Sequence, residues 1–314
     1  MQKILFAEIN SKAKPFLKWA GGKAQLLKEL SSRLPSEIIK THIIERYIEP
    51  FVGSGALFFY LKNNFDVKES YLFDINRELI IGYKVIQTNH QELIKKLFIL
   101  QDKYLKNSQE ERMRFYYKIR ASYNKQILNF DYENCNKEWI DRATYLIFLN
   151  KTCYNGLFRQ NKKGEFNVPF GRYKNPKICD ERNIITTNAA LKNTKIFFGD
   201  FTKSDKYINN KSFIYFDPPY RPISETSNFT AYSNFIFDDE QQKKLSVYFK
   251  KMHERGAKLM LSNSDPKNID SEDDFFDRLY TGFIIERVPA KRYINCDAAG
   301  RGAINELIIR NYEL

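Results

Sequence analysis

The feature that most constrains the fold is a glycine-containing turn between a strand signal and a helix signal. Residues 43–49 (IIERYIE) end in a β-favouring stretch, residues 50–55 (PFVGSG) read as a turn, and the ALFFYLK that follows has helical character. A second apolar segment, 71–73, ends at Asp74, and residues 76–85 can start another helix. This order predicts a βαβ unit, which is the seed of a parallel sheet.

The rest of the chain divides into a helical stretch, a basic segment and a run of strands. Residues 90–150 place apolar side chains at helical spacing. Residues 151–177 carry seven basic residues against one acidic residue, Glu165, together with glycines and aromatics, which is typical of an irregular binding loop. Strand signals are then found at 195–198, 213–216, 257–261, 283–288 and 304–309. The helical sequence DDEQQKKLSVYFKKM lies between the second and the third of them.

These patterns predict an α/β sheet that ends in an antiparallel hairpin and carries an inserted, mostly helical module. We expect the sheet to be built from residues 1–85 and 186–314, and the inserted module from residues 86–185. At 314 residues, the chain is long enough for one large domain or for a core with an insertion.

Charge and cysteine content narrow the partners and the setting. Lys and Arg number 51 against 38 Asp and Glu, a formal charge of +13, which favours a polyanionic partner without choosing between nucleic acid and an anionic membrane. No stretch approaches the length of an apolar membrane span, and the N-terminus lacks a signal-peptide run. The four cysteines lack metal-ligand spacing, so we expect free thiols, no bound metal and a cytoplasmic setting.

The turn at 50–55 and Asp74 together indicate a nucleoside-type ligand. Glycines after a strand let the backbone approach a ligand closely, and the helix that begins there offers free N–H groups. Asp74 follows Gly55 by 19 positions, where a carboxylate can accept hydrogen bonds from both hydroxyls of a ribose. The full G-x-G-x-x-G pattern is missing, so a dinucleotide is less favoured.

The segment Asp217-Pro218-Pro219-Tyr220 follows the apolar strand signal FIYF and is therefore expected at the carboxyl end of a strand. Its residue types suit methylation of an amino group. The amino nitrogen of adenine is a poor nucleophile because its lone pair is delocalised into the ring. Asp217 and the carbonyl of Pro218 can accept hydrogen bonds from its two N–H groups, and Tyr220 offers a face on which an extruded base can stack.

With these residues in view, the chain resembles the DNA adenine-N6 methyltransferases of the Dam type, the α-arranged group whose members recognise GATC. The resemblance covers nearly the whole chain and implies a Rossmann-like methyltransferase sheet. It rests on eight ordered segments: FLKWAGGK at 16–23, EPFVGSG at 49–55, DIN at 74–76, YNGLFR at 154–159, NVPFGRY at 167–173, GDF at 199–201, DPPY at 217–220 and LSN at 261–263.

The resemblance implies S-adenosylmethionine as cofactor and a set of residues that bind it. Trp19 and Lys23 would line the donor pocket, with Lys23 near the methionyl carboxylate, and Asp74 would bind the ribose. Asp200 and Phe201 would contact the adenine ring of the cofactor. The complete expected set is Trp19, Ala20, Gly21, Lys23, Glu49, Pro50, Phe51, Gly53, Ser54, Gly55, Asp74, Ile75, Asp200, Phe201 and Asp217.

The resemblance also implies double-stranded DNA as the substrate, read by the segment 86–185 together with Lys18. Arg159 is expected to grip a guanine, as Arg does bidentately, and Lys18 to lie near another guanine. Tyr154 and Asn155 would enter the duplex beside the flipped base. The expected DNA-binding set is Lys18, Tyr154, Asn155, Leu157, Arg159, Pro169, Arg172 and Tyr173, while Lys162, Lys163, Arg172, Lys174 and Lys177 would neutralise phosphates.

Other functions remain open at this level. Methyl transfer to cytosine N4, to RNA or to a glutamine amide uses related elements, and a protein of this fold that binds DNA without catalysis is a further alternative. Asp217, rather than Ser or Asn, favours adenine. The three histidines, His42, His90 and His253, suggest no nucleophilic catalysis. A restriction–modification role is compatible with the sequence, and a monomer is the favoured state.

Overall fold

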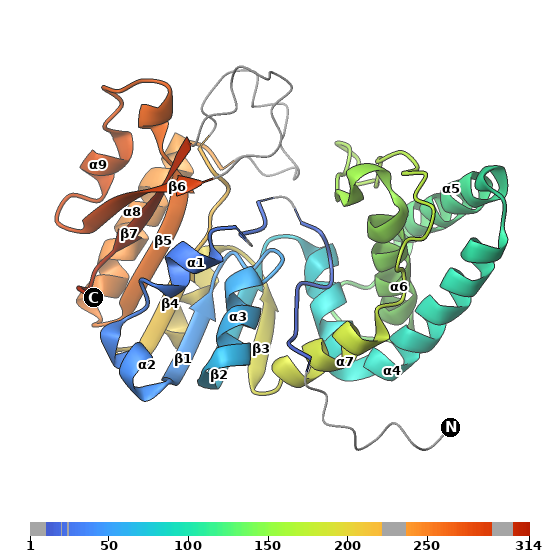
Figure 1. Ribbon diagram of the computed structural model, residues 1–314, viewed down its shortest axis with the longest axis horizontal. Helices are drawn as coiled ribbons and strands as arrows, with labels where there is room; N and C mark the ends of the chain where they lie inside the picture. The colour runs from blue at the N-terminus through green and yellow to red at the C-terminus, as the bar shows by residue number, and fades with distance from the viewer. Residues whose placement is uncertain (1–10, 20, 24, 222–236, 291–303) are drawn as a thin grey trace. The chain divides into compact units, whose positions relative to one another are not determined.

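The computed structural model describes residues 11–19, 21–23, 25–221, 237–290 and 304–314 (Figure 1). The chain divides into two compact units. We call residues 21–80 and 193–314 the sheet unit, and residues 1–20 and 81–192 the helical unit. The segment around Phe16 to Trp19 thus belongs with the helices, whereas the sequence-based division placed it with the sheet.

The described part of the sheet unit is built on one seven-stranded sheet with the order β3-β2-β1-β4-β5-β7-β6. Strands β1 to β5 are parallel to one another, whereas β7 pairs antiparallel with both β5 and β6. The predicted α/β fold with a terminal antiparallel hairpin is confirmed. The strands are β1 Ile43–Glu49, β2 Asp66–Asp74, β3 Thr194–Phe198, β4 Ser212–Phe216, β5 Lys258–Ser264, β6 Ile284–Ala290 and β7 Ile304–Arg310.

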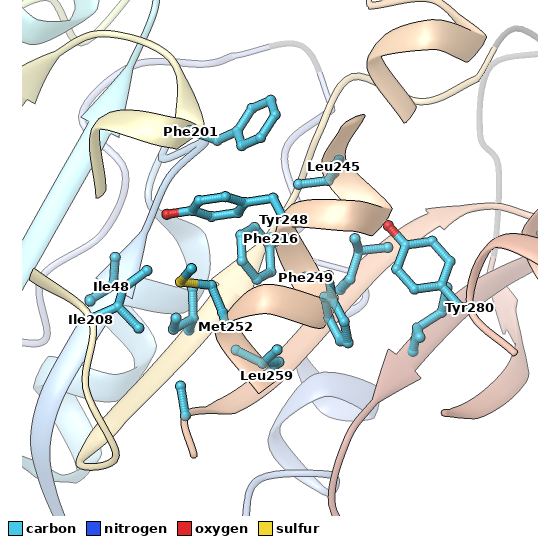
Figure 2. Packing of buried hydrophobic residues seen from close by; sticks show 14 of the residues in the cluster. Ile48, Phe201, Ile208, Phe216, Leu245, Tyr248, Phe249, Met252, Leu259 and Tyr280 are labelled. Carbon is cyan, nitrogen blue, oxygen red and sulfur yellow. The ribbon is translucent and has the colours of Figure 1, made fainter. Parts of the chain in front are cut away.

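Both faces of the sheet are covered, which explains why β4 is apolar at nearly every position. On one face, α8 (Asp239–Glu254) packs Phe249 and Met252 against Phe216 of β4 and neighbouring strand residues (Figure 2). On the other face, the ring of Tyr47 in β1 stacks near Phe58 of α3 (Ala56–Asn64). A strand buried on both faces reads as a continuous hydrophobic run, as FIYF does.

Shorter helices complete the sheet unit. Two of them, η3 and η5, directly follow strands β3 and β5 and so lie at the carboxyl edge of the sheet. In this sheet β1 and β4 are neighbours although they are far apart in sequence. Such a switch in strand order is where open α/β sheets bind ligands. The remaining elements of this unit are α1 Leu27–Ser31, α2 Ser36–Thr41, η3 Phe201–Tyr207, η5 Pro266–Asn268 and α9 Phe275–Leu279.

The helical unit is dominated by α4 (Arg77–Lys106), α5 (Gln109–Gln126) and α6 (Lys137–Thr152), which confirms the predicted helical character of residues 90–150. The division between the units falls near the start of α4, between residues 80 and 81. Further along α4, the backbone is non-helical at Asn89 (φ −133°). Side-chain caps define the other starts: Ser108 forms a capping box with Glu111, and Asn136 caps α6.

The basic segment is mostly irregular, as expected. It contains the 3-10 turn η2 (Tyr154–Gly156) and two isolated bridges, Cys153 to Phe170 and Gln160 to Phe166. Helix α7 (Glu181–Ala190) follows it and was not anticipated. Among the described helices, none combines the length and hydropathy of a membrane span.

Candidate functional site

The glycine turn and Asp74 form one structural unit at the carboxyl ends of β1 and β2. Gly53 (φ 47°) and Gly55 (φ 70°) both adopt the left-handed conformation, which glycine reaches without a steric penalty. The Asp74 carboxylate accepts hydrogen bonds from the backbone N–H of Gly53 (3.0 Å) and of Asn76 (2.8 Å). Burial raises the pKa of Asp74 to about 6, although the amide donors oppose this shift.

Glu49, the last residue of β1, places a second carboxyl at this edge. It is 2% exposed and accepts a hydrogen bond from the hydroxyl of Tyr47 (2.8 Å). Burial raises the pKa of Glu49 well above its usual value, and hydrogen bonds from Tyr47 and the backbone of Phe58 only partly counter it. The edge thus carries two carboxyl groups with elevated pKa values.

Asp217 directly follows β4 and makes an ion pair with Lys23. The Lys23 ammonium lies 2.8 Å from Oδ1 of Asp217, donates to the carbonyl of Gly21 (2.8 Å), and lies 4.2 Å from the ring centroid of Tyr220. Ser262 of β5 donates a further hydrogen bond to Asp217 (3.2 Å). Burial raises the pKa of Asp217, and the Lys23 cation and the Ser262 hydroxyl lower it in part.

The hydroxyl of Tyr220 contacts a residue that the sequence did not single out. Its hydroxyl donates to Oε2 of Glu306 (2.6 Å), which belongs to β7 and lies opposite Ser264 of β5. Burial raises the pKa of Tyr220 well above its usual value, so the phenol stays protonated and remains a donor. The contact depends on the antiparallel insertion of β7, which the local sequence around Glu306 does not reveal.

The backbone of the Asp217–Tyr220 segment is fixed by a chain of amides. Gln242, fully buried in α8, donates to the Pro219 carbonyl (3.1 Å), and Asn263 donates to Gln242 (3.2 Å). The N–H of Arg221 in turn donates to Asn263 (3.3 Å). No described residue donates to the Pro218 carbonyl. The two consecutive carbonyls therefore differ: one is anchored, and the other has no partner within the described residues.

The predicted adenine-contacting pair lies at the end of β3. The Asp200 carboxylate is exposed and accepts from the N–H of Thr202 (2.9 Å), which caps η3. Phe201 is buried, and its ring lies 5.6 Å from that of Phe51. Of the other predicted cofactor residues, Pro50 and Gly55 are buried, Phe51, Gly53, Ser54 and Ile75 are half-buried, and Gly21 is exposed.

Trp19 belongs to the helical unit. Its ring stacks on Phe158, with centroids 5.0 Å apart and planes inclined by 19°. Ala20, also predicted to bind the cofactor, lies outside the described residues. Trp19 was predicted to bind the cofactor, whereas Phe158 belongs to the matched segment YNGLFR and had no predicted role, so their stacking was not expected from the sequence.

Tyr154 and Asn155, two of the predicted DNA-reading residues, lie on the tight turn η2 after α6. Tyr154 is 57% exposed, and Asn155 has a left-handed backbone (φ 57°). The N–H of Tyr154 donates to the carbonyl of Pro169 (2.8 Å), which ties the two halves of the segment together. At Gly171, an added Cβ would lie 2.5 Å from the Cys153 carbonyl oxygen. The close approach of the backbone at Cys153 and at Gly171 therefore requires glycine.

Arg159 is exposed and oriented by a single contact. Its Nε donates to Oδ1 of Asn167 (2.9 Å), and no described residue accepts from its terminal nitrogens. Among the cations expected to bind phosphates, Lys177 is paired with Asp180 (2.6 Å). Lys18, Pro169, Arg172 and Tyr173 are exposed, Leu157 is half-buried, and Lys162, Lys163 and Lys174 are exposed.

Side chains of α5 support this segment from behind. The Tyr116 hydroxyl donates to the carbonyl of Val168 (2.7 Å), and the Arg112 guanidinium donates to the carbonyl of Lys174 (2.7 Å). Asn124 exchanges two hydrogen bonds with the backbone of Phe166. The irregular segment is therefore a fixed surface, although it contains little regular secondary structure.

Known proteins resemble this sequence over most of its length. Residues 19–294 match the family described as D12 class N6 adenine-specific DNA methyltransferase. The chain is 49% identical over 300 residues to the type II methyltransferase M.MjaIII of Methanocaldococcus jannaschii, covering 95% of this chain and 99% of that protein. It is 36% identical over 302 residues to the type II methyltransferase M1.LlaDCHI of Lactococcus lactis subsp. cremoris, covering 95% of each.

A third relative carries a different name. The chain is 35% identical over 257 residues to the DNA adenine methylase of Escherichia coli strain K12, covering 81% of this chain and 82% of that protein. The family match spans both units, from Trp19 to the Asp217–Tyr220 segment and beyond. The chain therefore belongs to the D12 class of N6 adenine-specific DNA methyltransferases.

Proposed function

We propose that this methyltransferase uses S-adenosylmethionine to methylate adenine N6 within GATC in double-stranded DNA, after flipping the target adenine out of the duplex. The observation that carries the proposal is the Asp217–Tyr220 segment at the end of β4. It combines a carboxylate, a carbonyl with no described partner at Pro218, and a half-buried aromatic ring. The family implies S-adenosylmethionine as methyl donor and DNA as substrate.

The residues at the carboxyl edge of the sheet fit this cofactor. The left-handed glycines at 53 and 55 keep the turn free of side chains, so a ligand can lie against the backbone. Asp74 is held on that turn with lone pairs suited to ribose hydroxyls. The Glu49 carboxyl and the Lys23 ammonium, which is paired with Asp217, offer an acceptor and a cation for an amino acid tail. When bound, S-adenosylmethionine supplies an electrophilic methyl group.

The protein's own contribution to the reaction is to hold the target amine. Asp217 and the Pro218 carbonyl accept hydrogen bonds from its two N–H groups, which draws the nitrogen toward tetrahedral geometry and localises its lone pair. Tyr220 stacks on the base, and Glu306 fixes the ring through the phenol. Positioning and electrostatics thus account for most of the rate, because no general base of neutral pKa is needed before methyl transfer.

The site of methylation is read by the helical unit. Arg159 has exposed guanidinium nitrogens for the O6 and N7 atoms of a guanine, and Lys18 is proposed to contact a second guanine. Tyr154 and Asn155, exposed at the tip of the turn, are proposed to enter the duplex and fill the gap left by the flipped base. Leu157 and Pro169 would contact a thymine methyl.

One assay tests the activity and the site separately. The protein is incubated with radiolabelled S-adenosylmethionine and duplexes that contain GATC or any single-base change of it, and the labelled nucleoside is identified. We expect label in N6-methyladenine of the GATC duplex and little in the others. No labelled N6-methyladenine in any duplex contradicts the proposed activity, whereas equal label in duplexes without GATC contradicts only the site.

A role as a modification enzyme is a further part of the proposal. Two relatives that match almost end to end are named type II methyltransferases. Such an enzyme protects host DNA by methylating the site that a partner nuclease cuts. DNA methylated to completion by this protein should resist a nuclease that cuts unmethylated GATC, and persistent cleavage would contradict the assigned sequence.

A further inference from the structure

Asn150, near the end of α6, makes three hydrogen bonds to the backbone of two separate segments. Its side chain is 1% exposed. Its Oδ1 accepts from the N–H of Lys18 (3.0 Å), and its Nδ2 donates to the carbonyl of Lys18 (2.9 Å) and to the carbonyl of Gly156 (2.9 Å). One buried amide thus joins the N-terminal segment to the turn that carries Tyr154 and Asn155.

The chemistry of this contact is specific to a primary amide. Three hydrogen bonds to one N–H and two carbonyls require one acceptor and two donors, which the asparagine side chain supplies. A carboxylate retains only the acceptor, and an aliphatic side chain retains neither. Because the groups are buried, a substitution would leave backbone polar atoms without partners.

A second observation shows that the two segments touch directly. Gly156 has a left-handed backbone (φ 64°), and an added Cβ there would lie 3.1 Å from Cδ of Lys18 and 3.3 Å from the Asn150 carbonyl oxygen. The stem of Lys18 therefore lies against the turn. The stack of Trp19 on Phe158 joins the same two segments, one residue after Lys18 and two residues after Gly156.

We infer that Asn150 is a positioning residue for DNA sequence recognition, which keeps Lys18 and the Tyr154–Arg159 turn in a fixed register. The inference rests on the proposed function, because it takes these residues to contact the DNA. With its backbone fixed on both sides, Lys18 reaches the DNA through side-chain rotation alone. Such pre-organisation restricts the bases that Lys18 can satisfy, since a mobile cation would adapt to several.

The chain contains a matched control. Asn183 in α7 makes the same pair of hydrogen bonds to Lys14: its Oδ1 accepts from the N–H (3.0 Å) and its Nδ2 donates to the carbonyl (3.1 Å). Asn183→Ala therefore removes an equivalent contact from the same N-terminal segment, four residues away from Lys18. Lys14 has no proposed contact with DNA.

The test measures methylation of a duplex library in which the bases around one adenine are randomised, followed by mapping of the methylated adenines. For Asn150→Ala, we expect the preference for the best site over its single-base variants to fall by roughly 10-fold at one or more positions. Asn183→Ala should retain the wild-type preference. A uniform loss of activity on all sequences by Asn150→Ala, with its preference unchanged, would overturn the inference.

Two further variants separate recognition from folding. Asn150→Ser keeps a hydroxyl that can donate and accept a hydrogen bond, so it provides a second measurement if Asn150→Ala does not fold; we expect a smaller loss of preference. In a Lys18→Ala background, Asn150→Ala should change the preference no further at the position that Lys18 reads. An additional change there would contradict action through Lys18.

Failure of the inference differs from failure of the proposed function. If the wild-type protein methylates no adenine, the proposed activity is wrong, and if it methylates all adenines alike, the proposed site is wrong. If the wild-type protein is selective and both Asn150 variants keep its selectivity, only the positioning role is wrong. Thermal unfolding of each variant, compared with Asn183→Ala, reports how much of any activity loss comes from stability.

Discussion

The ammonium of Lys23 lies 2.8 Å from Oδ1 of Asp217, the carboxylate that the proposed mechanism assigns to the target amine. The same ammonium lies over the ring of Tyr220. An ammonium and an adenine amino group are both N–H donors, so they compete for the same acceptor. The pairing also changes the charge state of Asp217, because the cation lowers a pKa that burial raises.

Replacing Lys23 with Met should therefore raise the pKa of Asp217. The proposed reaction needs the ionised carboxylate, so the acidic limb of the pH profile of kcat should move to higher pH. The measurement is kcat at saturating DNA and cofactor between about pH 5 and pH 9. Lys28→Met, which removes an exposed lysine of α1, is the control and should leave the limb in place. An unchanged limb in Lys23→Met would show that another group sets it.

Replacing Asp217 with Asn should remove the charge but keep the size of the side chain. We expect kcat to fall by about 10²-fold or more, the loss typical when one preorganised polar contact to a transition state is removed. DNA binding, measured by fluorescence anisotropy, should change little because the residues proposed to read the DNA lie in the helical unit. Asp66→Asn, which alters an exposed ion pair with Lys68, is the control. Wild-type turnover by Asp217→Asn would remove Asp217 from the reaction.

The elevated pKa of Asp74 predicts a pH dependence of cofactor binding. Burial raises this pKa to about 6, so the carboxylate is ionised above that pH and protonated below it. Ribose hydroxyls donate to the ionised form, and affinity should therefore weaken as the pH falls through about 6. Calorimetric titration with S-adenosylhomocysteine measures this. Asp74→Asn should bind S-adenosylhomocysteine more weakly at neutral pH and lose this part of the pH dependence. If Asp74→Asn shows the same pH dependence as the wild type, a group other than Asp74 causes it.

Arg159 and the lysine pair at 162 and 163 should differ in the kind of defect that they cause. Arg159→Ala should reduce discrimination at one base pair, by an amount equivalent to about 1–3 kcal/mol. Removal of both Lys162 and Lys163 should weaken binding to all sequences alike and reduce its salt dependence. Binding isotherms on the GATC duplex and its single-base variants at several salt concentrations distinguish the two. An equal loss on every sequence by Arg159→Ala would exclude it from base reading.

Glu306 should influence turnover through the Tyr220 ring. Glu306→Gln keeps an acceptor for the phenol, which donates to Glu306 at 2.6 Å, whereas Glu306→Leu removes it. We expect Glu306→Leu to lower kcat by a larger factor than it changes KM. Glu306→Gln should retain much of the wild-type kcat. Tyr220→Phe provides the comparison, because it removes the hydroxyl from the other side. If Glu306→Gln and Glu306→Leu have the same kcat, the hydrogen bond has no role in positioning.

Much of the fold could be predicted because the relevant signals are local. The continuous apolar run of β4 and the glycine turn before α3 each depend on the chemistry of neighbouring residues. The position of Asp217 after a strand followed from the same reasoning. The full length of β2 and the presence of α7 could not be predicted in this way. Their polar positions weaken the local pattern, and tertiary packing decides their length.

The sequence by itself determined the chemical types at the site: a carboxylate, two prolines and an aromatic ring after a buried strand, and a glycine turn followed by Asp74. The tertiary structure alone decided which distant side chains meet them. Glu306 reaches Tyr220 across 86 positions, and Asn150 reaches Lys18 across 132. Such contacts depend on strand order and helix packing, and the side chains that make them carry no local pattern, because hydrogen-bond partners are chosen by position in space.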